Sequence, residues 1–169
     1  MPRPFSIKSV LRHGLRAQNE LVMIKGSYLA KIDEKSRLRM PAEFRRGLPE
    51  TVDNTYYVTS DTGKCAQVYP LPVWEKIEQK LQALPQTNKA KRKLQRITSY
   101  YGLLTEMDPQ GRILIPQVLR EDAQISGEVS VLAINGDHLE VWNKETIDRD
   151  VKENLLTDED WEELNKMGI

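Results

Sequence analysis

The chain has 169 residues, with 25 basic and 25 acidic side chains and a formal net charge of zero. This length suits one or two small domains. Its single cysteine, Cys65, excludes an intrachain disulfide and fits a reducing compartment, and no run of about 18 apolar residues is present to form a membrane-spanning helix. We therefore expect a cytoplasmic protein without a membrane partner.

The zero net charge hides an asymmetry along the chain. Residues 1–102 carry 19 basic and nine acidic side chains, a net charge of +10, whereas residues 103–169 carry six basic and 16 acidic ones, a net charge of −10. A basic front half is typical of proteins that bind a polyanion such as nucleic acid. An ordinary solvated surface explains the charges equally well, so charge alone does not choose between the two.

Residues 1–22 form an extension that matches nothing later in the chain. The segment is basic but has no apolar core of the kind a secretory signal needs. We expect it to be disordered, or Met23 to be the true start.

Residues 27–73 read as a first unit of short strands. Pro41 suits the first position of a short helix, where its missing N–H costs nothing, and Gly47 with Pro49 ends that helix. A hairpin follows around the turn 61–63. The predicted strands cover 28–32, 38–40, 56–59 and 65–69.

Residues 74–101 predict a spacer of two helices. Apolar residues recur at helical spacing on both sides of Pro85, which separates the helices. We expect the basic side chains of the second helix to form its outer, solvated face rather than a binding site. These are Lys89, Lys91, Arg92, Lys93 and Arg96.

Residues 102–145 predict a second unit with the same order of strands and one short helix. Asn135-Gly136-Asp137 is a strong signal for its hairpin turn. The acidic tail, residues 146–169, holds a predicted capping box that begins at Thr157.

The two units are copies of one pattern. A constant offset of 75 residues superimposes Asp33 on Asp108, Arg37 on Arg112, Pro41 on Pro116 and Arg45 on Arg120, and apolar positions follow the same offset. A unit of about 45 residues is too small to bury a sufficient core alone. We therefore expect the two units to share one core.

The doubled pattern Asp-x-x-x-Arg, followed each time by a proline, resembles the MraZ family of bacterial transcriptional regulators, whose units are of the SpoVT-AbrB swapped-hairpin type. The resemblance covers roughly residues 23–150 and includes Tyr69-Pro70-Leu71-Pro72 before Trp74. It implies a mainly β fold with short helices (α+β), in which two swapped-hairpin units interlock as a pseudo-dimeric barrel with a helical spacer between them.

The same resemblance implies a function. Such proteins are sequence-specific DNA-binding regulators that assemble as ring-like homo-oligomers on repeated DNA boxes upstream of the division and cell-wall gene cluster. The expected partners are double-stranded DNA and further copies of the chain, in the cytoplasm and on the nucleoid. The DNA box, the subunit number and the choice between repression and activation do not follow from the sequence.

The resemblance places DNA-facing side chains at Arg37, Arg45, Arg46, Arg112 and Arg120. From the residues themselves, an aspartate at a turn entry accepts backbone N–H bonds, so Asp33 and Asp108 are expected to shape their turns. Two alternatives stay open for the arginines four residues on: an ion pair with the aspartate, or contact with a phosphate or a guanine edge. Arg39 has no basic counterpart in the second unit and receives less weight.

The two turns differ at one position. Gly111 supplies a positive φ in the second turn, whereas Ser36 stands at the matching position of the first, where the family pattern usually has glycine. We expect some backbone strain at Ser36.

Catalysis finds little support in the sequence. One cysteine and two distant histidines cannot build a familiar zinc site, and no phosphate-binding loop or dinucleotide motif is present. We therefore expect no enzyme activity, metal, cofactor or small-molecule substrate. The alternative function is an oligomeric scaffold whose basic face binds a protein partner.

Overall fold

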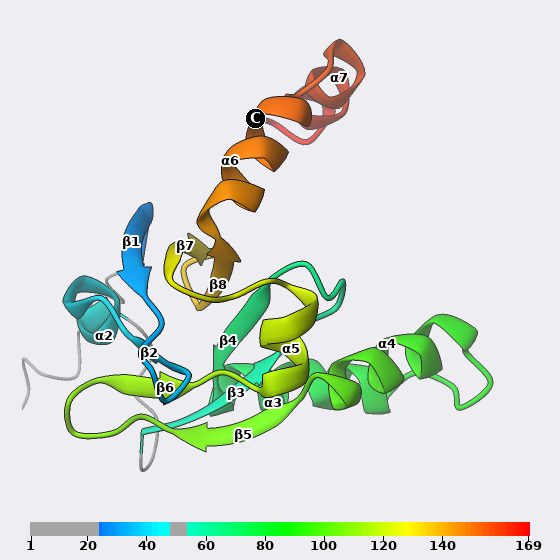
Figure 1. The fold of residues 1–169 in the computed structure, drawn as a ribbon. Helices are drawn as coiled ribbons and strands as arrows, with labels where there is room; N and C mark the ends of the chain where they lie inside the picture. Colours follow the sequence, from blue (N-terminus) through cyan, green and yellow to red (C-terminus); the bar gives the residue numbers. More distant parts are fainter. Residues whose placement is uncertain (1–23, 48–53) are drawn as a thin grey trace, which may run out of the picture.

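The computed structural model describes residues 24–47 and 54–169, and over these the fold is α+β with strands predominating, as expected (Figure 1). The extension 1–22, Met23 and the predicted helix end at Pro49 lie outside the described residues. The described strands are β1 (Ser27–Lys31), β2 (Arg37–Arg39), β3 (Thr55–Thr59), β4 (Ala66–Pro70), β5 (Leu103–Glu106), β6 (Arg112–Leu114), β7 (Glu128–Ile134) and β8 (His138–Asn143). The described helices are α2 (Ala42–Gly47), α3 (Leu71–Gln82), α4 (Lys89–Tyr100), α5 (Gln117–Asp122), α6 (Lys144–Glu153) and α7 (Asp158–Lys166).

The two units exchange strands. The main sheet has six antiparallel strands in the order β1-β7-β8-β4-β3-β5, so β1 of the first unit pairs with β7 of the second, and β5 of the second pairs with β3 of the first. The short strands β2 and β6 pair with each other in a separate two-stranded sheet. Hydrogen bonds between the described strands do not close the main sheet into a ring, so the pseudo-dimeric barrel stays a prediction.

One hydrophobic core serves both units. Its most deeply buried members include three pairs related by the 75-residue offset: Leu38 and Ile113, Met40 and Ile115, Phe44 and Leu119. Each pair takes one side chain from each unit, and burying one such side chain contributes about 1.5–3 kcal/mol. The expected shared core is therefore present.

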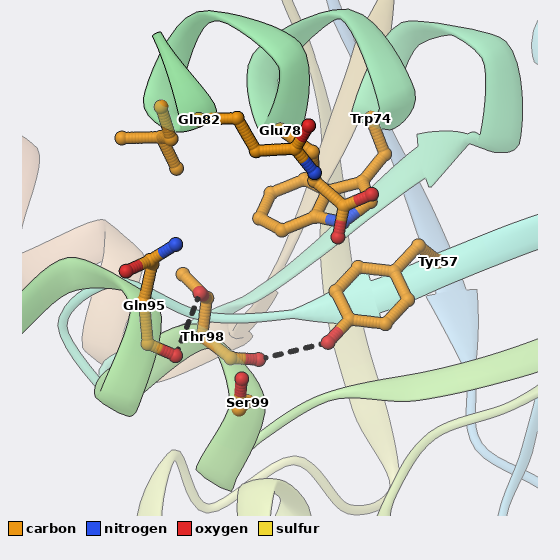
Figure 2. Close-up of a pocket in the computed structure, with 8 residues that line it drawn as sticks. Tyr57, Trp74, Glu78, Gln82, Gln95, Thr98 and Ser99 are labelled. Carbon is orange, nitrogen blue, oxygen red and sulfur yellow. Dashed lines mark hydrogen bonds between the residues drawn. The ribbon is translucent and has the colours of Figure 1, made fainter. Parts of the chain in front are cut away.

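The helical spacer is attached to β3 by aromatic packing and hydrogen bonds. Trp74 of α3 stacks on Tyr57 with ring centroids 4.7 Å apart. The Tyr57 hydroxyl donates to the Thr98 carbonyl of α4 over 3.1 Å, and the Thr59 hydroxyl donates to the same carbonyl over 2.7 Å (Figure 2 shows the bond from Tyr57). The small pocket between these residues encloses about 170 Å³.

One residue of α4 departs from the expectation for its outer face. Lys91 is 2% exposed, and its Nζ donates to the Leu84 carbonyl over 2.9 Å. The turn between α3 and α4 folds back far enough to bring that carbonyl to the lysine. The other four basic side chains of the predicted face, Lys89, Arg92, Lys93 and Arg96, are exposed.

The chain ends in two helices that extend away from the sheet (Figure 1). The capping box at the start of α7 is present as expected, because the Thr157 and Asp160 side chains each accept a hydrogen bond from the other's backbone N–H. Among the described residues, no helix has the length and apolar character that crossing a membrane requires.

Candidate nucleic-acid interface

The two Asp-x-x-x-Arg turns lie side by side because β2 and β6 pair. The Met40 N–H donates to the Gly111 carbonyl over 2.8 Å, and the Ile115 N–H donates to the Ser36 carbonyl over 3.3 Å. The two bonds are equivalent under the 75-residue offset, because Met40 matches Ile115 and Ser36 matches Gly111. The two turns are therefore related by a pseudo-two-fold axis. Segments 75 residues apart in sequence thereby form one surface.

Asp33 organises the first turn with both of its carboxylate oxygens. Its Oδ1 accepts the backbone N–H groups of Lys35 and Arg37, each over 2.9 Å. Its Oδ2 accepts Nε of Arg37, also over 2.9 Å. The hydrogen bond from the Arg37 backbone is the main reason why the pKa of Asp33 lies below its usual value.

Asp108 repeats this arrangement in the second turn. It accepts the N–H groups of Gln110 and Arg112 over 2.9 Å and Nε of Arg112 over 2.6 Å. Partial desolvation acts to raise the pKa of Asp108, but the hydrogen bonds from Arg112 outweigh it, so the pKa is lowered. Nη1 of Arg37 also lies 3.7 Å from Oδ2 of Asp108, which links the two turns.

These contacts fix Arg37 and Arg112 in place without using all their donors. A guanidinium carries five N–H donors, and the bond to the aspartate in the same turn uses the one on Nε. Both side chains remain about a quarter exposed. Each arginine is therefore held by a carboxylate while part of its side chain stays exposed, which reduces the entropy lost on binding an anion.

Gly111 gives Arg45 its position. The φ of Gly111 is +76°, and a Cβ at this residue would lie 2.6 Å from Nη1 of Arg45 and 2.8 Å from its Cδ. The exposed Arg45 side chain, which belongs to α2 of the first unit, therefore lies directly over the turn of the second unit. Any side chain at residue 111 would push it away.

Arg120, the arginine of the second unit that matches Arg45, has different contacts. Nε of Arg120 donates to the Ile115 carbonyl near the start of its own helix, over 3.1 Å. The residue that matches Gly111 is Ser36, which has a φ of +66° and carries a Cβ. A Cβ is therefore present at the position where, in the opposite turn, it would meet Arg45.

A groove of about 700 Å³ runs beside the paired turns. It collects three of the arginines named from the sequence, Arg37, Arg45 and Arg112, and it adds two basic residues, Arg39 and Lys31. Two acidic residues, Asp33 and Glu43, also line it, so the groove carries an excess of positive charge. Arg46 is exposed on α2, and neither it nor Arg120 lines the groove.

Arg39, which received less weight from the sequence, also lines the groove. In β2 the buried Leu38 lies between Arg37 and Arg39, and alternation along a strand directs both arginines to the opposite face from the leucine. The register also places Arg39 opposite Arg112. The alternating pattern Arg-Leu-Arg already indicated that Arg37 and Arg39 share one face of the strand. Arg39 received less weight because the second unit has no basic residue at the matching position.

In the described parts of the chain no group of three or more His, Cys, Asp or Glu side chains is arranged to hold a metal ion. Cys65 is buried, and burial raises the pKa of its thiol, so the reactive thiolate is disfavoured.

Comparison with known proteins finds one family. A family model described as "MraZ protein, putative antitoxin-like" matches residues 23–97 and 104–160. The chain is 43% identical over 147 residues to a protein named transcriptional regulator MraZ from Acidobacterium capsulatum, covering 87% of this chain and 100% of the relative. Proteins of the same name from Koribacter versatilis and Nitrosospira multiformis are 43% identical over 148 residues and 42% identical over 123 residues. These matches cover 87% and 73% of this chain, and 100% and 83% of the relatives.

Proposed function

Because the chain belongs to the MraZ family of transcriptional regulators, we propose that it binds double-stranded DNA in a sequence-specific way through the paired turns and the groove beside them. The single observation that carries this proposal is that two aspartate-held arginines, Arg37 and Arg112, lie together beside one basic groove. The name of the relatives describes a regulator of transcription rather than a class of enzyme.

The chemistry of the groove suits the DNA backbone. Arginine binds phosphate oxygens through paired N–H donors, and such contacts set the position of a protein on the duplex. Arginine also donates to O6 and N7 of guanine in the major groove, which is the commonest specific base contact. We assign these contacts to Arg37, Arg39, Arg45 and Arg112, with Arg46 at the edge of the surface.

We give Arg120 a positioning role. Its Nε is engaged by the Ile115 carbonyl, and it does not line the groove. Its side chain therefore fixes the start of α5 relative to β6, and its contribution to DNA affinity is indirect.

The proposal also covers how the protein assembles and which genes it regulates. We propose that the protein acts as a ring-like homo-oligomer on repeated DNA boxes, on the nucleoid, at the division and cell-wall gene cluster. Family membership supports this extension. A single chain presents one small groove, so contact with several boxes at once would raise the affinity through effective concentration.

The test is the salt dependence of binding to duplex DNA. Boxes are first selected from random sequence, and affinity is then measured at several salt concentrations. Each lost phosphate contact should lower the slope of log K against log salt by about 0.9, so Arg37→Ala and Arg112→Ala should each reduce affinity and slope. Lys64→Ala, which removes an exposed lysine outside the groove, is the control and should bind normally.

Two results would contradict the proposal. The wild-type protein would bind no duplex with selectivity, or both arginine variants would keep wild-type affinity and slope. Absence of DNA binding by an intact oligomer would favour the scaffold alternative, in which the basic face binds a protein.

A further inference from the structure

The acidic arm, residues 146–169, exposes apolar surface that no other described residue of the chain covers. No residue of α7 is buried. Six large apolar side chains of the arm are more than two-fifths exposed: Val151, Leu155, Leu156, Trp161, Met167 and Ile169. Exposed apolar side chains, where they form a contiguous patch, usually mark an interaction surface.

The length of α7 leads to the same conclusion. The helix has nine residues, and isolated helices shorter than about 12–15 residues are marginal in water. Its capping box contributes only about 1 kcal/mol. Packing of the Trp161 face against another surface would supply the missing stabilisation.

The basic hairpin, residues 71–101, is the complementary surface of the same chain. The acidic arm carries eight acidic and three basic side chains, a net charge of −5. The basic hairpin carries seven basic and two acidic ones, a net charge of +5. It also exposes two apolar side chains, Leu84 at 42% and Tyr100 at 65%.

Within one chain the two surfaces do not meet. In Figure 1 the arm extends upward from β8, whereas α4 extends to the right from the far end of the sheet. The paired turns of β2 and β6 lie on a third side. A contact between arm and hairpin therefore requires two chains, and it leaves the candidate DNA-binding surface of each chain open.

We propose that the acidic arm of one chain docks on the basic hairpin of the next copy of the same chain. The two sides of this contact are different surfaces, so it repeats from chain to chain and generates either a closed ring or an open filament. The inference rests on the proposed homo-oligomer and names the surfaces that build it.

A charge-exchange experiment tests this contact in the full chain. One variant carries Glu159→Lys, Glu162→Lys and Glu163→Lys on the arm, which leaves the capping box intact. The other carries Arg92→Glu, Lys93→Glu and Arg96→Glu on exposed positions of the hairpin. Each variant alone has two surfaces of the same sign and should sediment as a monomer of 19.5 kDa rather than a multiple of it.

Mixing the two variants in equal amounts should restore the assembly, because each arm then meets an oppositely charged hairpin. Lys64→Glu is the control for charge reversal outside both surfaces and should assemble like the wild type. Circular dichroism melts of each variant verify that it is folded.

Three results would overturn the inference: assembly of either variant alone as in the wild type, failure of the mixture of folded variants to reassemble, or a wild-type protein that stays monomeric. DNA binding is measured separately on a duplex with one box. Its presence in a protein that fails these assembly tests would leave the proposed DNA function standing, whereas its absence in an assembled protein would remove that function alone.

Discussion

Gly111→Ala tests the geometry of the candidate interface directly. Two properties of Gly111 exclude a side chain: its φ of +76°, and the Arg45 atoms that a Cβ would meet at 2.6–2.9 Å. The first concerns the backbone and affects stability. The second concerns a flexible, exposed arginine, which can move aside without disturbing the core.

The two effects have different sizes and different readouts. Placing an L-residue in the left-handed region costs about 1–2 kcal/mol. For a chain of this length that corresponds to a fall in Tm of about 2–8 °C. If Arg45 contacts DNA as proposed, displacing it removes a charge-assisted contact of about 1.5–3 kcal/mol, a loss in affinity of about 10- to 140-fold.

Gly127→Ala is the matched control. Gly127 also has a positive φ, +62°, but no heavy atom lies within 4 Å of the position that a Cβ would take. The control should therefore show a similar fall in Tm and unchanged DNA affinity. Both variants are measured by thermal melts and by fluorescence anisotropy with the same duplex at one salt concentration.

Binding of DNA by Gly111→Ala as tight as that of Gly127→Ala would contradict this prediction. The prediction fails equally if the Gly111→Ala substitution weakens binding by the same factor in an Arg45→Ala background, because Arg45 would then not carry the effect.

Other predictions concern stability and reactivity. Ser36→Gly should raise the free energy of unfolding by about 0.5–1 kcal/mol in denaturant melts, because it relieves a φ of +66°, and an unchanged value would show no strain there. Asp33 and Asp108 have lowered pKa values in the folded protein, so the stability they contribute is present above the unfolded pKa of about 3.9 and is lost as pH falls through their folded values. Acid titrations followed by circular dichroism should show a weaker loss in that range for the double Asn variant than for the wild type. Cys65 should resist an aromatic disulfide reagent at neutral pH until the chain is unfolded, and rapid labelling of the native protein would contradict its burial.

The sequence predicts the turns well because their bonds are local. The carboxylate of Asp33 reaches N–H groups two and four residues on, and Asp108 does the same, so a short motif contains the whole interaction. The shared core follows from the apolar positions at the 75-residue offset, such as Leu38 and Ile113. Both the local spacing and the repeated apolar pattern can be recognised in the sequence without knowledge of the tertiary structure.

The sequence fails where a side chain depends on a distant segment. Lys91 precedes Thr98 by seven residues, so the helical period places it on the buried face with Thr98, and only the Leu84 carbonyl makes that position tolerable for a charge. Because Lys91 carries a charge, the sequence predicted it on the solvated face of the helix instead. The position of Arg45 likewise depends on Gly111 of the opposite turn, which sequence position cannot show.

The divergence of the two copies bears on how DNA would be contacted. A surface with a perfect two-fold axis presents equal contacts in both directions and suits a palindromic site. Here Arg45 lies over the turn at Gly111, whereas Arg120 bonds to the Ile115 carbonyl of its own unit, so the surface has a direction. In a head-to-tail assembly through the acidic arm and the basic hairpin, every copy would have the same orientation around the ring. Directional surfaces in a directional assembly fit boxes repeated in one orientation rather than inverted pairs.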